Sequence, residues 1–461
     1  MTGSGGGESV AKMLQVAKQI AAALESGVAP LIYKTHRIYP ETLRDGAEQF
    51  ERINKQFAPE LDKSAPARSR VRGAAVAPPS GASARGTDHL PDPTADENFL
   101  DLPIEVQIRR LEEAHGIRTD AQRALELSLF MEDKFRDIAL ISRQARPETI
   151  FDGPEGWASW LDARLFARRN LHREMSVDLL QEFHRRLRIR HDPETAGRMQ
   201  GARRSAFGTL SRPLSRSARA AIEENPLLTY APGPFRTEPY GVVFHPSVEG
   251  RLGAREMRPL DAPPTAEELA TFRDDPLQAY IGPDFAIRGG MSEGGVIIYP
   301  NFGSVEGTRV FHQSLCDDYN AAREQSGYRP YQAAAHFQRQ LISGHSWEGP
   351  FHGRHSRVAL NFLLEQAGKP PSAIADFNDD LYVSSSQWVE KVEEGSSRYQ
   401  RWQNKLEQAG GDMDPVDLFD DLRPMMRQYQ EMGGESSPFE PGQWHDSGKY
   451  EQLHGQLRSG S

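Results

Sequence analysis

The stretch from His345 to Arg357 (HSWEGPFHGRHSR) holds the residues best suited to chemistry. It combines a histidine, a carboxylate and a Gly-Arg-x-x-Arg turn between two segments of helical periodicity. A helix that begins at such a turn directs unpaired backbone N–H groups and the positive end of its dipole towards an anion. Arg354 and Arg357 add fixed positive charge, and His345 lies upstream as a candidate proton acceptor. The stretch therefore predicts a phosphate site with a general base.

The composition describes an acidic chain with room for one main domain and appendages. Its 461 residues carry a formal net charge of −10, with 38% hydrophobic and 26% charged residues. The single cysteine, Cys316, excludes an intramolecular disulfide and favours a reducing compartment. No apolar run long enough to span a membrane is present, and the glycine-rich start lacks the positive region of a secretory signal. We expect a cytoplasmic protein; delivery to another cell by a specialised secretion system stays open.

The positive charge of the chain is unevenly distributed. Residues 185–219 hold ten arginines against only Asp192 and Glu194. We interpret this stretch as a solvated loop, while an acidic partner, a phosphate-bearing ligand or RNA stays open as its target. The net negative charge of the whole chain argues against general nucleic-acid binding. The sequence does not determine the oligomeric state.

Changes in composition divide the chain into four parts. Residues 1–57 contain amphipathic helical patterns, and residues 58–98 are rich in Ala, Pro, Ser, Gly and Arg with few bulky apolar residues. The first part is predicted to be a separate helical interaction segment and the second a flexible linker. Residues 99–400 form the predicted domain, with its core at about 176–371, and residues 401–461 form a polar C-terminal tail.

Apolar residues recur at helical spacing in several stretches of the domain. Ser176 is a candidate cap for one of the clearest patterns. Short β-like runs lie among prolines and glycines between residues 225 and 310. We expect helices at 120–142, 157–171, 176–188, 331–343 and 355–367, and strands at 242–245 and 296–299.

The motif and its surroundings resemble the Fic family, whose pattern is His-x-Phe-x-(Asp/Glu)-Gly-Asn-Gly-Arg-x-x-Arg between two helices of an all-α domain. Other stretches follow in the family's order. Residues 179–187 resemble its Leu-x-x-x-His-Arg-x-Leu helix, Gly233 to Arg236 resemble its Gly-x-x-Arg turn, and 294–302 (GGVIIYPNF) resemble the β-hairpin flap that clamps the target. The resemblance extends over about residues 120–395.

The resemblance implies a mainly α fold: a Fic-like helical domain with a small β-hairpin flap, here with flexible N- and C-terminal extensions. It also implies a nucleotidyltransferase that moves AMP from ATP to a Ser, Thr or Tyr hydroxyl of a target protein. His345 would be the general base, Glu348 would hold Mg²⁺, and Ile298 and Tyr299 in the flap would align the target. The residues that would bind the nucleotide and its phosphates are His352, Gly353, Arg354 and Arg357.

Three differences from the family pattern lie in the motif itself. Seven residues separate His345 from Gly353 where the pattern has six, and the carboxylate follows the histidine by three positions and not four. Phe351 and His352 replace Gly-Asn in the turn. Two alternatives to AMP transfer therefore stay open: a Fic-fold enzyme that uses another donor, such as CDP-choline, or a small-molecule acceptor, and a Fic-fold binding or effector module.

Two further interpretations concern regulation and metal binding. Ser128-Leu-Phe-Met-Glu132 resembles the family's inhibitory (Ser/Thr)-x-x-x-Glu helix, whose glutamate pairs with the motif's second arginine, here Arg357; the alternative is an ordinary glutamate paired with Arg136. His352 and His355, together with His345 or Glu348, could in principle hold Zn²⁺. The adjacent arginines argue against a dication at this place.

Overall fold

The computed structural model describes residues 93–95, 98–143, 146–147, 152–201, 207–210, 213–232, 242–246, 255–259, 262–268, 279–281, 294–300, 302, 304–433 and 447–459. The chain divides into two compact units, and all of these residues belong to the unit formed by 78–246 and 253–461. The predicted interaction segment 1–57, most of the linker, and the turn with Gly233 and Arg236 lie outside the described residues.

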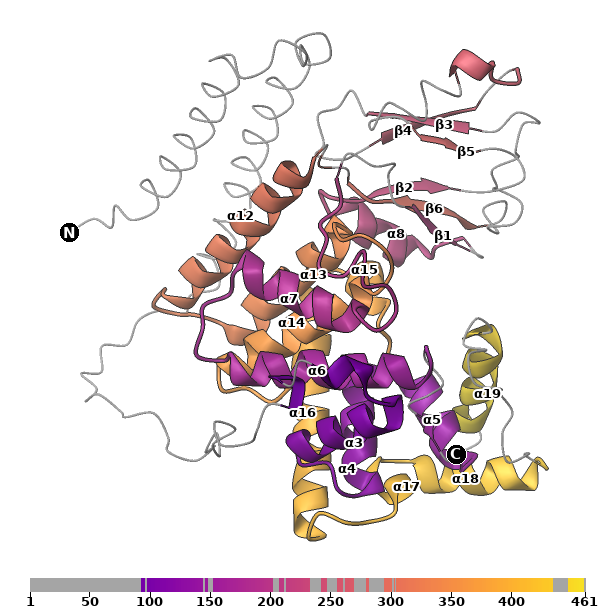
Figure 1. Ribbon diagram of the computed structural model, residues 1–461. Coiled ribbons are helices and arrows are strands. Elements are labelled where there is room, and N and C mark those ends of the chain that lie inside the picture. Colours follow the sequence, from indigo (N-terminus) through magenta and orange to yellow (C-terminus); the bar gives the residue numbers. More distant parts are fainter. Residues whose placement is uncertain are drawn as a thin grey trace, which may run out of the picture. The chain divides into compact units, whose positions relative to one another are not determined.

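The described part of the chain is mainly α-helical, as predicted (Figure 1). Its first half contains the 3₁₀ turns Pro93–Ala95 and Phe99–Asp101 and the helices α3 (Ile104–His115), α4 (Asp120–Phe130), α5 (Asp133–Ile141), α6 (Gly153–Arg169), α7 (Val177–Arg188) and α8 (Arg216–Glu223). Its second half contains α12 (Val305–Arg323), α13 (Pro330–Gly344), α14 (His352–Gln366), α15 (Asp379–Tyr382), α16 (Ser385–Gln408), α17 (Pro415–Leu418), α18 (Leu422–Glu431) and α19 (Ser447–Ser459). None of the described helices has the length and apolar character needed to cross a membrane.

The long helix predicted at 120–142 is two helices. Met131 and Glu132 adopt extended backbone conformations between α4 and α5. The Asp133 N–H donates to Ala375 O at 3.1 Å and so leaves the helical ladder. Apolar periodicity continues across the break because both helices face the same core, so the sequence pattern did not reveal it.

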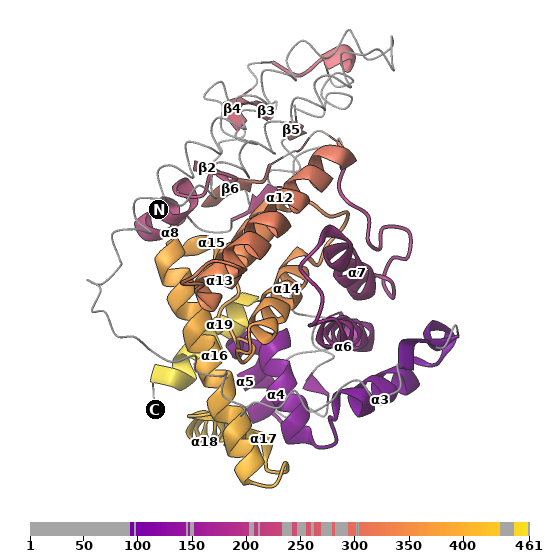
Figure 2. The ribbon, with the colours of Figure 1, turned by 90° about the vertical axis from the view of Figure 1, so that its left-hand side faces the viewer.

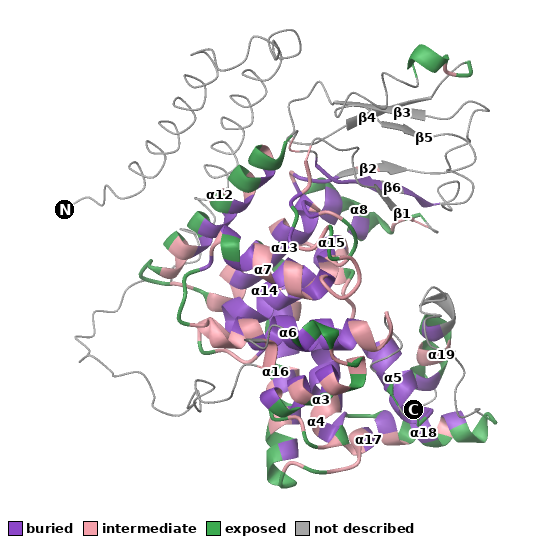
Figure 3. Ribbon diagram, in the orientation of Figure 1, coloured by how far each residue is buried: buried purple, intermediate pink, exposed green. Residues whose placement is uncertain are grey.

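The central helices of the fold pack around α13 and α14. α13 contacts α12, α14 and α16, while α14 also contacts α6 and α7 (Figure 2). The buried residues concentrate along these shared faces (Figure 3). Ser176 caps α7, as predicted, because its side chain accepts a hydrogen bond from Leu179 N–H. α14 begins at His352 and not at residue 355, so the motif's Gly-Arg lies inside its first turn.

Among the described residues between α7 and α12, the strands form two three-stranded antiparallel sheets. One has the order β1-β6-β2, formed by β1 (Phe207–Thr209), β2 (Thr229–Pro232) and β6 (Gly295–Ile298); the other has the order β4-β3-β5, formed by β3 (Val242–Pro246), β4 (Arg255–Pro259) and β5 (Ala279–Ile281). The strand predictions at 242–245 and 296–299 are confirmed. The flap predicted as a hairpin at 294–302 is instead the central strand of a sheet, because β6 pairs with β1 on one edge and β2 on the other.

The C-terminal tail contributes to the core of the domain. The predicted boundary after residue 400 falls inside α16. α17 packs on α4, and both α18 and α19 pack on α5. The tail is polar in composition, but several of its large apolar side chains in the described residues are buried, among them Trp402, Tyr429 and Tyr450. A few apolar side chains on one face of each helix are enough to pack it against the core. The mean composition of the tail does not show them because polar residues outnumber them.

Arginines of the 185–219 stretch pair within the chain. Arg186 and Arg190 both bind the buried carboxylate of Asp162 in α6 and so fasten α7 to it. Other pairs in the described part of this stretch are Arg185–Glu182, Arg188–Asp192 and Arg219–Glu223. These arginines have structural partners and do not depend on an acidic ligand.

Candidate functional site

A short loop between α13 and α14 carries the motif. His345 caps α13 with φ 43° and ψ 44°, and Phe351 precedes α14 with φ 85°, so both occupy the left-handed region that side chains seldom adopt. The loop pairs with the chain near residue 199: Gln200 N–H donates to Ser346 O at 2.8 Å, and Glu348 N–H donates to Arg198 O at 2.9 Å. Two backbone bonds therefore fix residues 346 and 348 of a loop that carries a left-handed residue at each end.

Trp347 anchors the loop in the core. Its ring is 1% exposed and stacks on His184 and His312, with centroids 5.0 and 4.8 Å apart and planes at 21° in both pairs. His312 also bonds Ser346 Oγ through Nε2 at 2.6 Å. Burial lowers the pKa of His184 to about 2 and that of His312 to about 3, so both are neutral and structural.

His345 is an uncharged imidazole at neutral pH. Burial lowers its pKa to about 4, and its Nδ1 is buried without a hydrogen-bond partner. Its ring stacks on His352 at 3.5 Å between centroids and lies 4.4 Å from the ring of Tyr299. A neutral imidazole can accept a proton, which is the requirement for a general base.

Arg354 lies in the first turn of α14 and is paired within the chain. Its guanidinium forms an ion pair with Asp152, the residue that precedes α6, and lies over the rings of Phe130 and Phe351. Burial lowers its pKa, and Asp152 opposes that effect. An anion at this turn would compete with Asp152 for the same guanidinium.

Arg357 is a buried cation with unmet hydrogen-bonding capacity. Its guanidinium lies 3.5 Å from the ring centroid of Phe377, and Nη2 donates a long bond of 3.4 Å to Phe130 O. Nε is buried without a partner. Burial and the nearby Arg354 lower the pKa of Arg357 to about 9. Such a group gains most from an anion that supplies both charge and acceptors.

Glu348 has the only acidic side chain between His345 and Arg357, and it is partly exposed. Within the described residues, no three His, Cys, Asp or Glu side chains are placed to hold a metal together. The Zn²⁺ interpretation fails for His355, which is buried and bonds Leu180 O through Nε2 at 2.8 Å. One carboxylate does fit Mg²⁺ if phosphate oxygens and water complete its shell.

The predicted inhibitory pair between Glu132 and Arg357 is not formed among the described residues. Glu132 pairs with Lys134 at 2.9 Å, although the charge of Arg357 is near enough to affect its pKa, which burial raises. The alternative pair with Arg136 is not formed either, because Arg136 binds Asp133 and Asp137. Ser128 is fully buried and donates to Leu125 O.

The predicted flap residues are both buried. Ile298 ends β6 and is 0% exposed. Because both edges of β6 are occupied, a target strand cannot pair with its backbone along Gly295–Ile298, which corrects the predicted clamp. Tyr299 follows the strand and lies against His345, where it belongs to the site itself.

A second carboxylate near Arg357 was not identified from the sequence. Asp380 in α15 is buried and accepts a bond of 2.9 Å from Gln338, which also donates to Ser356 Oγ at 3.1 Å. Burial raises the pKa of Asp380 to about 7, and Arg357 opposes that effect. Asp152 was missed as well. Asp380 and Asp152 lie outside the motif, and no periodic pattern in the sequence indicates that either one lies near the site.

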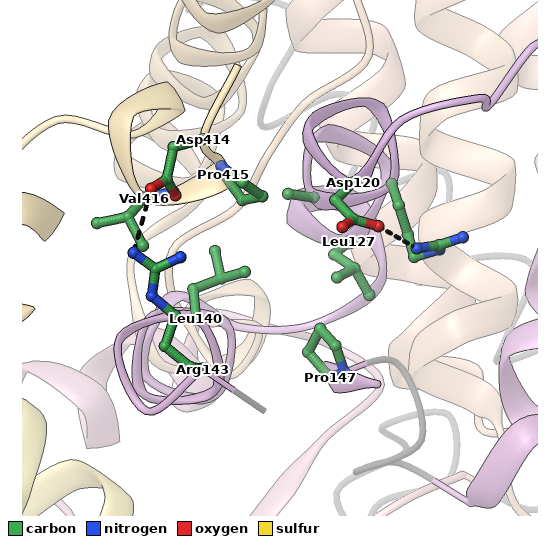
Figure 4. Close-up of a pocket in the computed structure, with 10 residues that line it drawn as sticks. Asp120, Leu127, Leu140, Arg143, Pro147, Asp414, Pro415 and Val416 are labelled. Carbon is green, nitrogen blue, oxygen red and sulfur yellow. Dashed lines mark hydrogen bonds and ion pairs between the residues drawn. The ribbon is translucent and has the colours of Figure 1, made fainter. Parts of the chain in front are cut away.

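A pocket of about 220 Å³ lies away from the motif, between α4, α5 and α17 (Figure 4). Two ion pairs flank it, Arg123–Asp120 and Arg143–Asp414. Its apolar lining is Ala124, Leu127, Leu140, Pro147, Pro415 and Val416. It contains none of the predicted site residues.

No model of a known protein family matches the chain, and no curated protein does. Solved structures do match it. Fic-1 from C. elegans is 15% identical over 68% of this chain and 74% of its own, with a TM-score of 0.28. A Fic domain containing signaling protein from Bacteroides thetaiotaomicron is 11% identical over 69% of this chain and 100% of its own, with a TM-score of 0.30. The names of both proteins place them in the Fic family, which is the family that the motif resembles. Matches this distant assign neither residue roles nor an activity to this chain.

Proposed function

We propose that the chain is a Fic-like transferase that moves AMP, or another nucleotide fragment, from a nucleotide donor to a protein hydroxyl. The observation that carries the proposal is that one loop places a candidate base and a candidate anion-binding cation close together. A neutral imidazole, His345, ends α13, and a buried cation with an unpaired donor, Arg357, lies one turn into α14. The first supplies a base and the second an incomplete anion site.

In the proposed reaction the hydroxyl of a Ser, Thr or Tyr side chain gives its proton to His345. The oxygen then forms a bond to the α-phosphorus of ATP, and the bond from that phosphorus to the bridging oxygen breaks, which releases pyrophosphate. The first amides of α14, including that of Gly353, would face the phosphates. Arg357, with Arg354, would stabilise the added negative charge in the transition state.

Glu348 would hold Mg²⁺ together with the phosphates of the donor. The ion would neutralise charge on the phosphate oxygens when bound. Glu348 follows Trp347 in the loop. Its backbone N–H donates a hydrogen bond to Arg198 O, which fixes the position of its backbone and so the point from which its side chain extends.

The Arg354–Asp152 ion pair favours a second candidate function, a binding module without transfer. A chain that already neutralises the first motif arginine binds phosphate less well than one that leaves it open. A different donor, such as CDP-choline, or a small-molecule acceptor also remains compatible with Phe351 and His352 in the turn.

Thermal unfolding with Mg²⁺ and a panel of nucleotides and CDP-choline tests the proposal without knowledge of the target. A donor present at about 100 times its Kd should stabilise the wild type by about 2.7 kcal/mol. Arg357→Ala should lose that stabilisation, and Arg219→Ala, which removes an exposed arginine of α8, should retain it. Absence of stabilisation by every donor would favour the binding module.

His345→Ala separates transfer from donor binding. The variant should still be stabilised by the donor, since the phosphates contact α14, but it should form no covalent adduct on a hydroxyl-bearing acceptor, as measured by intact-protein mass. Adduct formation by this variant at the wild-type rate would exclude His345 as the base.

A further inference from the structure

Three rings from three separate elements meet at His345. The centroids of His345 and His352 are 3.5 Å apart with planes at 30°, and those of His345 and Tyr299 are 4.4 Å apart with planes at 31°. Two rings this close and this nearly parallel cannot share one face of an imidazole. His345 therefore lies between His352 and Tyr299.

Each of the three rings lies at the end of a helix or strand, which fixes the position of its backbone. His345 is the residue that ends α13, His352 is the first residue of α14, and Tyr299 follows β6. His352 is 7% exposed and Tyr299 is 8% exposed. The left-handed Phe351 turns the chain so that His352 begins α14 beside the end of α13. The stack thus depends on the same strained loop that carries the motif.

The ring of His352 is not free to bind a phosphate in this arrangement. Its Nδ1 is buried without a partner, and its face is covered by His345. Burial and the neighbouring imidazoles of His345, His184 and His355 lower its pKa well below the usual range, so it carries no charge that would attract an anion. The phosphate-binding role predicted for His352 therefore does not fit the geometry.

We propose that His352 is a positioning residue for His345: its ring holds the imidazole of His345 flat against Tyr299 and shields one face of it from water. The inference rests on the proposed role of His345 as the general base. A base held this way keeps one ring orientation towards the hydroxyl, and the loss of water at one face makes its protonated form less stable. The titratable groups that face the pair are Tyr299 after β6, His184 in α7 and His355 in α14.

Two substitutions at position 352 separate the shielding from other roles. His352→Phe keeps a flat ring over His345, whereas His352→Ala uncovers it. Histidine-selective NMR of the full chain, with the His345 signal identified by its loss in His345→Ala, reports the titration of that ring. His345 should titrate as in the wild type in His352→Phe, and about 1 to 2 pH units higher in His352→Ala. His172→Ala, which removes an exposed histidine beyond α6, should leave it unchanged.

An unchanged titration of His345 in His352→Ala would overturn the inference, as would an equal shift in His352→Phe. His352→Asn, which is smaller and polar, replaces the alanine variant if that variant does not fold, with the same expected shift. In a transfer assay the acid limb of the pH profile should move upward with the NMR titration. A shift seen by NMR in a protein that transfers nothing would refute the proposed transferase and leave the positioning role intact.

Discussion

Arg354 of the motif forms an ion pair with Asp152, a residue outside the motif. Asp152 lies in the left-handed region just before α6 and pairs with Arg354, whose guanidinium also lies over the rings of Phe130 and Phe351. If the turn binds a phosphate as proposed, the carboxylate of Asp152 and a phosphate oxygen would both bind the Arg354 guanidinium. The proposed anion would then bind in competition with Asp152.

Asp152→Asn should tighten nucleotide binding by up to about fivefold, since a partly exposed ion pair contributes at most about 1 kcal/mol. Isothermal titration of the donor found in the thermal screen measures the change. Glu223→Gln, which breaks the exposed pair with Arg219, is the control and should leave the affinity unaltered. Weaker binding to Asp152→Asn would mean that Asp152 organises Arg354 and does not compete for it.

The motif residues could be found from the sequence because their spacing is local. His345, Glu348, Arg354 and Arg357 lie on one loop and the first two turns of one helix, which keeps them close together whatever the rest of the fold does. The side chains that decide their charge state come from other elements. Asp152 precedes α6, and Asp380 lies in α15, so only the packing of those elements reveals them.

At the scale of elements, α16 depends on a close approach to the chain that follows α14. A Cβ at Gly395 would lie 2.4 Å from Ser372 Oγ and 2.9 Å from Ala373 O. Ala373 N–H donates to Gly395 O at 3.1 Å, so two backbones meet there. Helical periodicity predicts that such a helix exists but carries no information about which residue it presses against its neighbour.

Gly395→Ala should destabilise the fold by about 1 to 3 kcal/mol through overpacking, although alanine is the better helix former. Urea unfolding followed by circular dichroism measures the loss. Gly455→Ala in α19 provides the matched comparison, because no atom lies within 4 Å of its new Cβ, and it should be neutral or slightly stabilising. Equal effects of the two substitutions would argue against the close approach.

At the scale of the whole described unit, buried ion pairs join helices that are distant in sequence. Glu365 of α14 accepts two bonds from Arg164 of α6, at 2.8 and 3.0 Å, and a third from Arg168. Burial opposes ionisation of Glu365, but these two arginines outweigh it and lower its pKa to about 2. The carboxylate therefore favours the folded state only while it is ionised.

Glu365→Gln should cost about 3 kcal/mol of unfolding free energy at pH 7, in line with a pKa lowered from 4.5 to about 2. The sign follows from the depressed pKa: the stabilisation is complete above about pH 4.5 and disappears as the pH falls through 2. Urea midpoints of wild type and variant between pH 7 and pH 2 should converge at the acid end. A difference that is constant with pH would assign the effect to packing and not to ionisation.

The C-terminal helix α19 is also joined to a helix that is distant in sequence. α19 packs on α5, where the ring of Tyr450 lies 4.7 Å from that of Phe135 with the planes tilted by 57°, and His454 bonds the buried Asp137 at 2.9 Å. Tyr450 and Leu457 are both 0% exposed. α5 begins next to Glu132, whose pKa Arg357 lowers against the effect of burial, so α19 packs on the helix that follows this residue.

Removal of residues 447–461 should lower the unfolding free energy by roughly 3 to 6 kcal/mol, because the burial of Tyr450 and Leu457 against the rest of the fold is lost. Urea unfolding of the shortened and full chains measures the difference, and Tyr450→Ala should reproduce most of it because Tyr450 fills the contact with Phe135. Ser459→Ala, at the last residue of α19, should have no comparable effect. Equal midpoints for the full and shortened chains would mean that α19 does not stabilise α5. A loss of donor binding by the shortened chain at temperatures where it stays folded would show that the tail also supports Arg357.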